Sequence, residues 1–382
     1  MHPDKDNSER FRKLFDAPID WDYLITAARY HRFIPFLFNS LKSIPETQVP
    51  SPVLKEVSQF FYNTVEWNLL KTAELFSIVD KLKDKGISSI PFKGPVLAQI
   101  LYGDISHRQF DDLDILIPRK DFHKIKEFLI AEGYQPELQV NLRQESMLLR
   151  SRHHFQFFHP RSKFYVEIHW EFSPALYSFN LHLAEVWCHR QTVGLLGRDV
   201  VSLAPSDMLL VLCEHGSRHY WKRLQWISDV ARLIELKGID WPFLERQARD
   251  IGSERDLLLG ISLAKALFNP EVPALISQKI TDNPEVLRLT NLVLDKIYSK
   301  NRDLGHITIE DNSPDIEEEL FYIHARERLR DRIRYYVRRA TSPSPREDLN
   351  FFVLPKILWP LYPIIRIGQL LKKYKLRIWK WI

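Results

Sequence analysis

The sequence predicts an α+β protein in which a small mixed sheet lies between N-terminal and C-terminal helical regions. Apolar residues recur at helical spacing in both end regions, whereas strand-like alternation is confined to about residues 87–172. The chain contains 12 Gly and 23 Pro residues, a balance that favours helices joined by short loops. Of its 382 residues, 45% are hydrophobic and 12% aromatic, which is enough to bury a sizeable core.

A chain of 382 residues exceeds one ordinary domain, and we expect four parts. They are an N-terminal helical region (1–85), an α/β core (86–200), a C-terminal helical region (201–342), and a linker followed by a basic amphipathic tail (343–382). The N-terminus lacks the apolar stretch of a secretory signal, and no run reaches the ~18 uncharged apolar residues of a membrane-spanning helix. The two cysteines lack disulfide or metal-knuckle spacing, so we expect a soluble cytoplasmic protein.

Helices are expected before residue 86. Asp20 is the predicted N-cap of a helix that runs to about Ile44, because apolar residues follow it at helical spacing. Pro50 and Pro52 interrupt the chain, and a long helix then continues to Gly86.

Short strands and helices alternate in the next segment. ISSIPF (87–92) and DLDILI (112–117) are predicted strands on either side of a predicted helix, GPVLAQILYG (94–103). A further helix over residues 119–134 carries its apolar residues on one stripe.

A predicted hairpin closes the α/β core. Its strands are HHFQFFH (153–159) and KFYVEIHWEF (163–172), joined by a tight Pro-Arg-Ser connection. Ser206 is then the predicted cap of a helix, and helices continue to about residue 340.

Two acids alternate with apolar residues in DLDILI. A strand directs successive side chains to opposite faces, so Asp112 and Asp114 share one face while Leu113 and Ile115 pack into the core. A buried carboxylate is costly unless it is paired or bound to a metal. A divalent cation between the two aspartates would offset their repulsion, and the alternative is a strand end whose acids point to water.

A second acidic strand repeats this pattern. Tyr165, Glu167, His169 and Glu171 share one face of KFYVEIHWEF, so Glu167 reaches the aspartates if the two strands are neighbours. Three such carboxylates can bind two Mg²⁺ ions, or Mn²⁺ in their place, and so support in-line phosphoryl or nucleotidyl transfer. His169 either lines this site or makes a hydrogen bond within the sheet.

The turn PFKGPVL offers a place for phosphate. At Gly94 the backbone can approach an anion, and the helix N-terminus that follows carries partial positive charge. Pro95 suits the first helical turn, and Lys93 could add a point charge.

The order of these features resembles a known family. The sequence contains, in this order, Lys93-Gly94, a helix ending in LYG, Arg108, Asp112-x-Asp114 and a later acid-x-His-Trp. This order resembles the uncharacterised bacterial nucleotidyltransferase family within the polymerase-β-like nucleotidyltransferase superfamily. The resemblance covers nearly the whole chain, since IDWDYLITAARYHRFIPFLF, EHGSRHYWKRLQWISDVARL and RDRIRYYVRRATSPSPREDLNFFVLP are similar to the N-terminal, middle and C-terminal helical segments of that family.

The resemblance implies a small mixed-sheet nucleotidyltransferase core between helical regions. Asp112, Asp114 and Glu167 would be the catalytic metal ligands, and Lys93 with Gly94 the phosphate-binding turn. The reaction would be Mg²⁺-dependent transfer of a nucleotidyl group from an NTP to a hydroxyl or phosphate acceptor on a small molecule, sugar or peptide. The sequence departs from the superfamily pattern at Pro95, where Gly or Ser is usual, and at Glu167, where Asp is commoner.

Several residues near this site have alternative roles. Arg108 would orient the acids or contact phosphate, and the alternative role of Glu167 is an ion pair with Arg108. His215 and His219 lie four residues apart, with Arg223 a turn later. We expect structural histidines, or residues that line the nucleotide or acceptor cleft, because a zinc pair would need a third ligand at a recognisable spacing.

Charge is concentrated near the C-terminus, although the net charge is only +5. RERLRDRIRYYVRR (326–339) is rich in arginine, and no acidic residue follows Asp348. A solvated helical face is the first interpretation, and an anionic partner is the alternative. Asp229 is expected to pair with an arginine of its own helical bundle.

Two other function classes remain open at this point. The first is a catalytically inactive nucleotidyltransferase-fold module that binds a ligand, with the basic, aromatic tail docked on a membrane surface or a protein complex. The second is nucleic-acid modification, which is weaker because aromatic residues are not interleaved with the arginines as a stacking platform requires.

Overall fold

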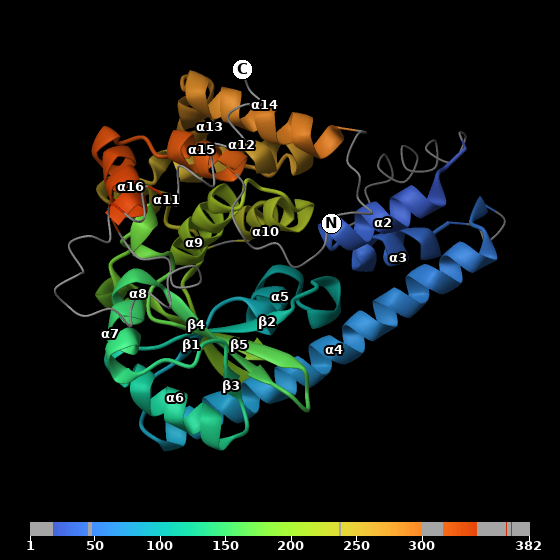
Figure 1. Ribbon diagram of the computed structural model, residues 1–382. Helices are drawn as coiled ribbons and strands as arrows, with labels where there is room; N and C mark the ends of the chain where they lie inside the picture. The colour runs from blue at the N-terminus through green and yellow to red at the C-terminus, as the bar shows by residue number, and fades with distance from the viewer. Residues whose placement is uncertain are drawn as a thin grey trace.

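The computed structural model describes residues 18–44, 48–236, 238–299 and 316–341, together with positions 364 and 368. A five-stranded mixed sheet lies at its centre and helical regions flank it on either side, which confirms the predicted fold class (Figure 1). Apart from positions 364 and 368, the expected linker and basic tail (343–382) lie outside the described residues. Among the helices of the described segments, none combines the length and apolar character needed to cross a membrane.

The strand order of the sheet is β1-β2-β5-β4-β3. The strands are β1 (Ile90–Pro91), β2 (Asp112–Leu116), β3 (Gln135–Pro136), β4 (His154–His159) and β5 (Phe164–His169). β2 and β5 are parallel neighbours, and every other pair in this sheet is antiparallel. The predicted hairpin is therefore confirmed as β4–β5, although β5 ends at His169, three residues before the predicted end of the strand.

One face of the sheet is apolar and packs on two helices. Leu113, Ile115, Val166 and Ile168 share a buried cluster with the C-terminal half of α4 (Ser51–Asp84) and with α6 (Phe122–Ala131). The apolar stripe predicted for α6 is buried. Because alternate side chains of β2 and β5 fill this core, the acids between them must face the other way.

The N-terminal helices pack on the start of α4. Asp20 caps α2 (Trp21–His31), as predicted, by accepting a hydrogen bond of 3.0 Å from the backbone N–H of Tyr23. The single helix expected up to residue 44 is wrong, because Arg32 adopts a left-handed conformation and α3 (Ile34–Lys42) starts anew after it. The long helix before Gly86 is confirmed as α4.

A second apolar cluster joins the C-terminal helices to one edge of the sheet. It includes Phe92 and Leu116 from the sheet region and residues of α5 (Gly94–Tyr102). The helices of this region are α9 (Pro205–Arg218), α10 (Leu224–Glu235), α11 (Trp241–Ile251), α12 (Glu254–Phe268), α13 (Ala274–Thr281), α14 (Pro284–Tyr298), α15 (Ile316–Ala325) and α16 (Leu329–Thr341). Ser206 does not cap α9: Ala204 holds that position, and the Ser206 hydroxyl accepts a hydrogen bond from the Asp240 backbone instead.

Several elements were not predicted. α7 (Leu142–Ser151) lies between β3 and β4, and the connection from β5 to α9 contains α8 (Leu183–His189) and a separate hairpin of β6 (Gln191–Leu195) and β7 (Arg198–Ser202).

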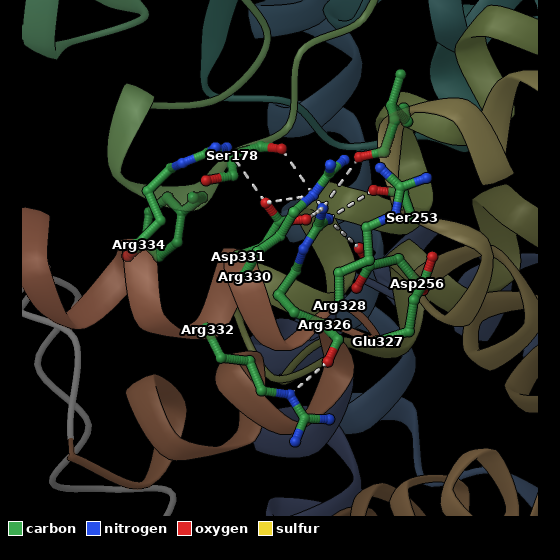
Figure 2. Close-up of polar contacts among 12 residues, drawn as sticks. Ser178, Ser253, Asp256, Arg326, Glu327, Arg328, Arg330, Asp331, Arg332 and Arg334 are labelled. Carbon is green, nitrogen blue, oxygen red and sulfur yellow. Dashed lines mark hydrogen bonds and ion pairs between the residues drawn. The ribbon is translucent and has the colours of Figure 1, made fainter.

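The arginine-rich segment 326–339 is not a uniformly solvated face. Figure 2 shows Arg326 inside a cluster of polar groups that includes Ser253 and Asp256. Its side chain is only 2% exposed, and its guanidinium group donates to Ser253 at 2.6 Å and to Asp256 at 2.9 Å. Arg330 and Arg334 remain exposed, so the solvated interpretation holds for part of the segment only.

Candidate active site

The acids expected to work together lie on adjacent strands. In the parallel pair β2–β5, Asp114 is directly opposite Glu167, and in the antiparallel pair β4–β5, Gln156 is opposite Glu167 on its other side. Asp112 lies two residues before Asp114 and therefore on the same face. The polar face of the sheet thus presents a row of Asp114, Glu167 and Gln156, with Asp112 next to it.

His169 lies between the two acids of that row. Its Nε2 atom is 3.1 Å from Asp114 Oδ1 and 3.2 Å from Glu167 Oε2. The Lys93 ammonium group is 3.6 Å from the same Asp114 oxygen. Positive charge from the chain itself therefore offsets part of the cost of burying these acids.

The three acids differ in the direction of their pKa shifts. Burial and the neighbouring carboxylates of Asp114 and Glu167 raise the pKa of Asp112 to about 7. Burial alone would also raise the pKa of Asp114, but Lys93 and His169 hold it below its ordinary value. Burial would likewise raise the pKa of Glu167, but His154 and His169 hold it below its ordinary value. Asp112 is thus the acid whose charge the chain leaves least compensated.

The turn before α5 brings a helix N-terminus to these acids. Gly94 has a left-handed φ of +54°, and a Cβ atom there would lie 3.2 Å from the backbone oxygen of Asp112. A residue without a side chain therefore allows the turn to contact β2. Pro95 occupies the first turn of α5, as the sequence predicted, where its missing N–H costs no hydrogen bond.

Family comparison identifies the family to which the chain belongs. Residues 17–269, more than half of the chain, match the model of a family described as uncharacterised nucleotidyltransferase. The chain belongs to this nucleotidyltransferase family.

Two solved structures show a distant similarity to this family member. The lincomycin-bound lincosamide antibiotic adenylyltransferase LnuA is 16% identical, over 36% of this chain and 83% of that protein, with a TM-score of 0.27. An antigenic nucleotidyltransferase-like protein from Paracoccidioides brasiliensis is 14% identical, over 53% of this chain and 94% of that protein, with a TM-score of 0.32. No curated protein sequence matches the chain.

In this nucleotidyltransferase, Arg108 has a partner other than the acids. Its guanidinium group donates to both carboxylate oxygens of Asp229 on α10, at 3.0 and 3.1 Å, and both side chains are buried. The alternative role considered for Glu167, an ion pair with Arg108, is therefore not formed, and the expectation that Asp229 pairs within its own helical bundle is wrong. The Arg108–Asp229 pair joins the segment before β2 to the C-terminal helices.

Helix α9 supplies histidines close to the same face. His215 and His219 are half-buried, with ring centroids 4.7 Å apart, and both rings pack on Trp226. Burial lowers the pKa of both histidines well below the ordinary value. For His215, the charge of Lys93 is the second cause. Their packing agrees with the structural role expected first. Among the described residues, neither belongs to a group that could hold a metal.

A further basic group lies beside Asp112. Arg32 forms an ion pair with Asp111, and Lys71 donates to the backbone oxygen of Phe110 at 2.7 Å. Burial, followed by the charge of Arg32, lowers the pKa of Arg223 to about 10. Arg223 was predicted to line the cleft. Arg32 and Lys71 were not predicted as site residues, although both are basic and lie in segments that were expected to be helical.

Sequence analysis also missed two histidines at the start of β4. His153 is buried, and His154 lies opposite His169 in the antiparallel register. Burial lowers the pKa of both, to about 3 for His154, so both rings are neutral at pH 7. The letters HH at the start of a predicted strand next to the acidic strand were the available signal.

Proposed function

We propose that this nucleotidyltransferase moves a nucleotidyl group from an NTP to a hydroxyl or phosphate acceptor and requires Mg²⁺ for the reaction. The carboxylates of Asp112, Asp114 and Glu167 would hold the metal, and the Lys93-Gly94 turn would hold the phosphates. The observation that carries the proposal is the parallel register of β2 and β5, which sets Asp114 opposite Glu167 on the face that also bears Asp112.

The residues present fit a divalent cation. Asp114 is 3% exposed, and its Oδ2 atom is buried without a hydrogen-bond partner. Burial and the charges of two other carboxylates raise the pKa of Asp112. Carboxylate oxygens are the ligands that Mg²⁺ prefers, and Mn²⁺ accepts the same set. Mg²⁺ bound there would neutralise phosphate charge and activate the attacking oxygen.

The side chains around the acids suit the other tasks of the reaction. Lys93 and the N-terminal end of α5 present positive charge next to Asp114, where a triphosphate would need it. Arg223 and Arg32 add charge on the side of Asp111. Binding and orientation of the phosphates would therefore depend on groups from the N-terminal helices, the core and the C-terminal helices together.

The acceptor would enter between the polar face of the sheet and α9. His215 on α9 and His219 at its C-cap, both subject to the charge of Lys93, would line the wall of this space. They are neutral because burial lowers their pKa values, so each can donate or accept a hydrogen bond but adds no charge.

The test is nucleotidyl transfer by the full-length protein with labelled NTPs, Mg²⁺ and an extract that supplies acceptors. We expect label transfer by the wild type and a loss of at least ~100-fold in Asp112→Asn and Asp114→Asn, because each removes a metal ligand. Asp104→Asn is the matched control, since Asp104 caps a short turn away from the acids, and we expect it to retain activity.

Two outcomes would contradict the proposal. One is transfer by Asp112→Asn and Asp114→Asn at the rate of the wild type. The other is binding of NTP by the wild type without any transfer, in the presence of Mg²⁺ or Mn²⁺, which would indicate the catalytically inactive binding module instead. Calorimetric titration with NTP, with and without Mg²⁺, separates this second case from a protein that binds no nucleotide.

A further inference from the structure

Three histidine side chains meet beside the carboxylates, at one end of β4 and β5. One ring nitrogen from each of His153, His154 and His169 lies within 4.8 Å of the other two. His153 Nε2 and His154 Nδ1 are 2.9 Å apart, and the ring centroids of His154 and His169 are 5.0 Å apart. The backbone fixes this meeting, because His154 and His169 are opposite each other in the β4–β5 register.

The chain leaves one ring nitrogen of His169 unsatisfied. The side chain is 3% exposed, and its Nε2 atom lies 3.1 Å from Asp114 and 3.2 Å from Glu167, whereas its buried Nδ1 atom has no hydrogen-bond partner. An unpaired buried polar atom costs about 1–3 kcal/mol. A ligand that binds the ring nitrogens of the cluster would remove this cost.

We propose that His153, His154 and His169 bind a transition-metal ion of the Zn²⁺ class, at a site next to the oxygen-lined Mg²⁺ site. Three imidazoles with an open fourth position are a recurring zinc ligand set. The carboxylate of Glu167, with Oε1 3.7 Å from His154 Nε2, stands beside the cluster as a fourth ligand or as a partner that orients His154.

The chemistry of the donors favours a transition metal over Mg²⁺ at this position. Neutral imidazole suits Zn²⁺, Co²⁺, Ni²⁺ and Fe²⁺, whereas Mg²⁺ prefers oxygen. The histidine nitrogens of a tetrahedral Zn²⁺ site are about 3.3 Å apart, given Zn–N bonds of about 2.0–2.1 Å. The present separations are at most 4.8 Å, so binding requires the ring nitrogens to move closer together. His154 keeps a 20% exposed side chain, which gives an ion a route to the cluster.

The test uses Co²⁺ alone as a spectroscopic substitute for Zn²⁺. Full-length protein treated with a chelator is titrated with Co²⁺, and visible absorption is recorded. We expect one equivalent to bind with the intense band of a four-coordinate site. His153→Ala and His154→Ala should each weaken Co²⁺ binding by at least ~100-fold, since removing an outer-shell partner alone costs about 10–100-fold.

Two control variants separate this site from other histidines and from the acids. His123→Ala removes a half-exposed histidine of α6 and should bind Co²⁺ as the wild type does. Asp112→Asn alters the proposed Mg²⁺ site and should keep the Co²⁺ band, so the result does not depend on whether the protein transfers nucleotides.

Three results would overturn the inference: no Co²⁺ band in the wild type, unchanged binding in both His153→Ala and His154→Ala, or loss of the band in Asp112→Asn alone. Circular dichroism checks that the variants fold. X-ray absorption of the Zn²⁺-loaded wild type gives an answer without any variant, since we expect scattering from three imidazoles, and a spectrum with oxygen ligands only contradicts the site.

Discussion

Gly94 controls how closely the turn before α5 approaches the strand of the acids. Two distinct constraints act on it. One is its left-handed backbone, and the other is the close approach of 3.2 Å that a Cβ atom would make to the Asp112 backbone oxygen. The first concerns the stability of the turn, and the second concerns the position of Asp112. The two can be separated, because Gly103 at the other end of α5 has a similar φ of +69° with nothing within 4 Å of a Cβ atom.

Gly94→Ala should lower the free energy of unfolding by about 1–3 kcal/mol and should also weaken Mg²⁺-dependent NTP binding, because the new methyl group pushes against the strand of the acids. Gly103→Ala, the matched control, should lose about 1–2 kcal/mol through backbone strain but keep its nucleotide affinity. Urea denaturation and calorimetric titration measure the two effects. Equal nucleotide affinity in both variants would show that contact between the turn and β2 has no functional role.

The positions of single side chains were only partly predictable from sequence. Strand alternation correctly predicted which face Asp112, Asp114 and Glu167 share. It could not predict His169 between two of them, because that requires the register of β2 against β5. The partner of Arg108 was also out of reach, since Asp229 lies 121 residues further along the chain and no local pattern connects the two.

Among the elements, α4 has the largest part in positioning the acids. It packs on α3 near its start and on the core of the sheet near its end. Midway, the buried Asn68 side chain donates to the backbone oxygens of Ile105 and Arg108, at 2.7 and 2.9 Å. Lys71, one turn further along the helix, donates to the backbone oxygen of Phe110. α4 therefore holds the segment that leads directly into the DLD strand.

Asn68→Ala should lower the free energy of unfolding by about 2–4 kcal/mol, because it leaves two buried carbonyl groups without a donor, at about 1–2 kcal/mol each. Asn63→Ala on the exposed side of the same helix removes only a contact with Gln59 and should change stability by less than about 0.5 kcal/mol. Thermal and urea unfolding give both values. Similar losses in the two variants would mean that the carbonyl groups find other donors.

Elements with long amphipathic patterns were predicted well, and short ones were missed. α4, α5 and α6 each have a clear helical pattern and a capping or breaking residue, so sequence was sufficient. The break between α2 and α3 was hidden because a non-glycine residue, Arg32, adopts the left-handed conformation there. The β6–β7 hairpin turns at Leu196 and Gly197, both with positive φ, and a leucine at such a position gives no turn signal.

At the scale of the whole molecule, buried ion pairs join regions far apart in the sequence. Arg108–Asp229 connects the core to α10, and Arg326–Asp256 connects the segment before α16 to α12. Breaking such a pair costs more than it contributes, because the remaining charge stays buried. These contacts hold the C-terminal helices in place. Charge patterning alone had predicted a solvated side chain for Arg326.

Arg326→Met should lower the free energy of unfolding by about 3–5 kcal/mol, since Asp256 then stays buried without its partner. Adding Asp256→Leu to this variant should recover most of the loss. Arg330→Ala is the control within the same segment: its side chain is 65% exposed, and we expect a change below about 0.5 kcal/mol. A loss of stability in Arg330→Ala as large as that in Arg326→Met would refute the assignment of the effect to burial.

The continuity of α4 has a consequence for evolution. With 34 residues the helix is about 50 Å long, and one rigid rod links the N-terminal pair α2–α3 to the underside of the sheet. Insertions or deletions inside it would rotate the two ends relative to each other by about 100° per residue. We therefore expect homologous chains to vary in the length of their loops while they preserve the residue count of this helix.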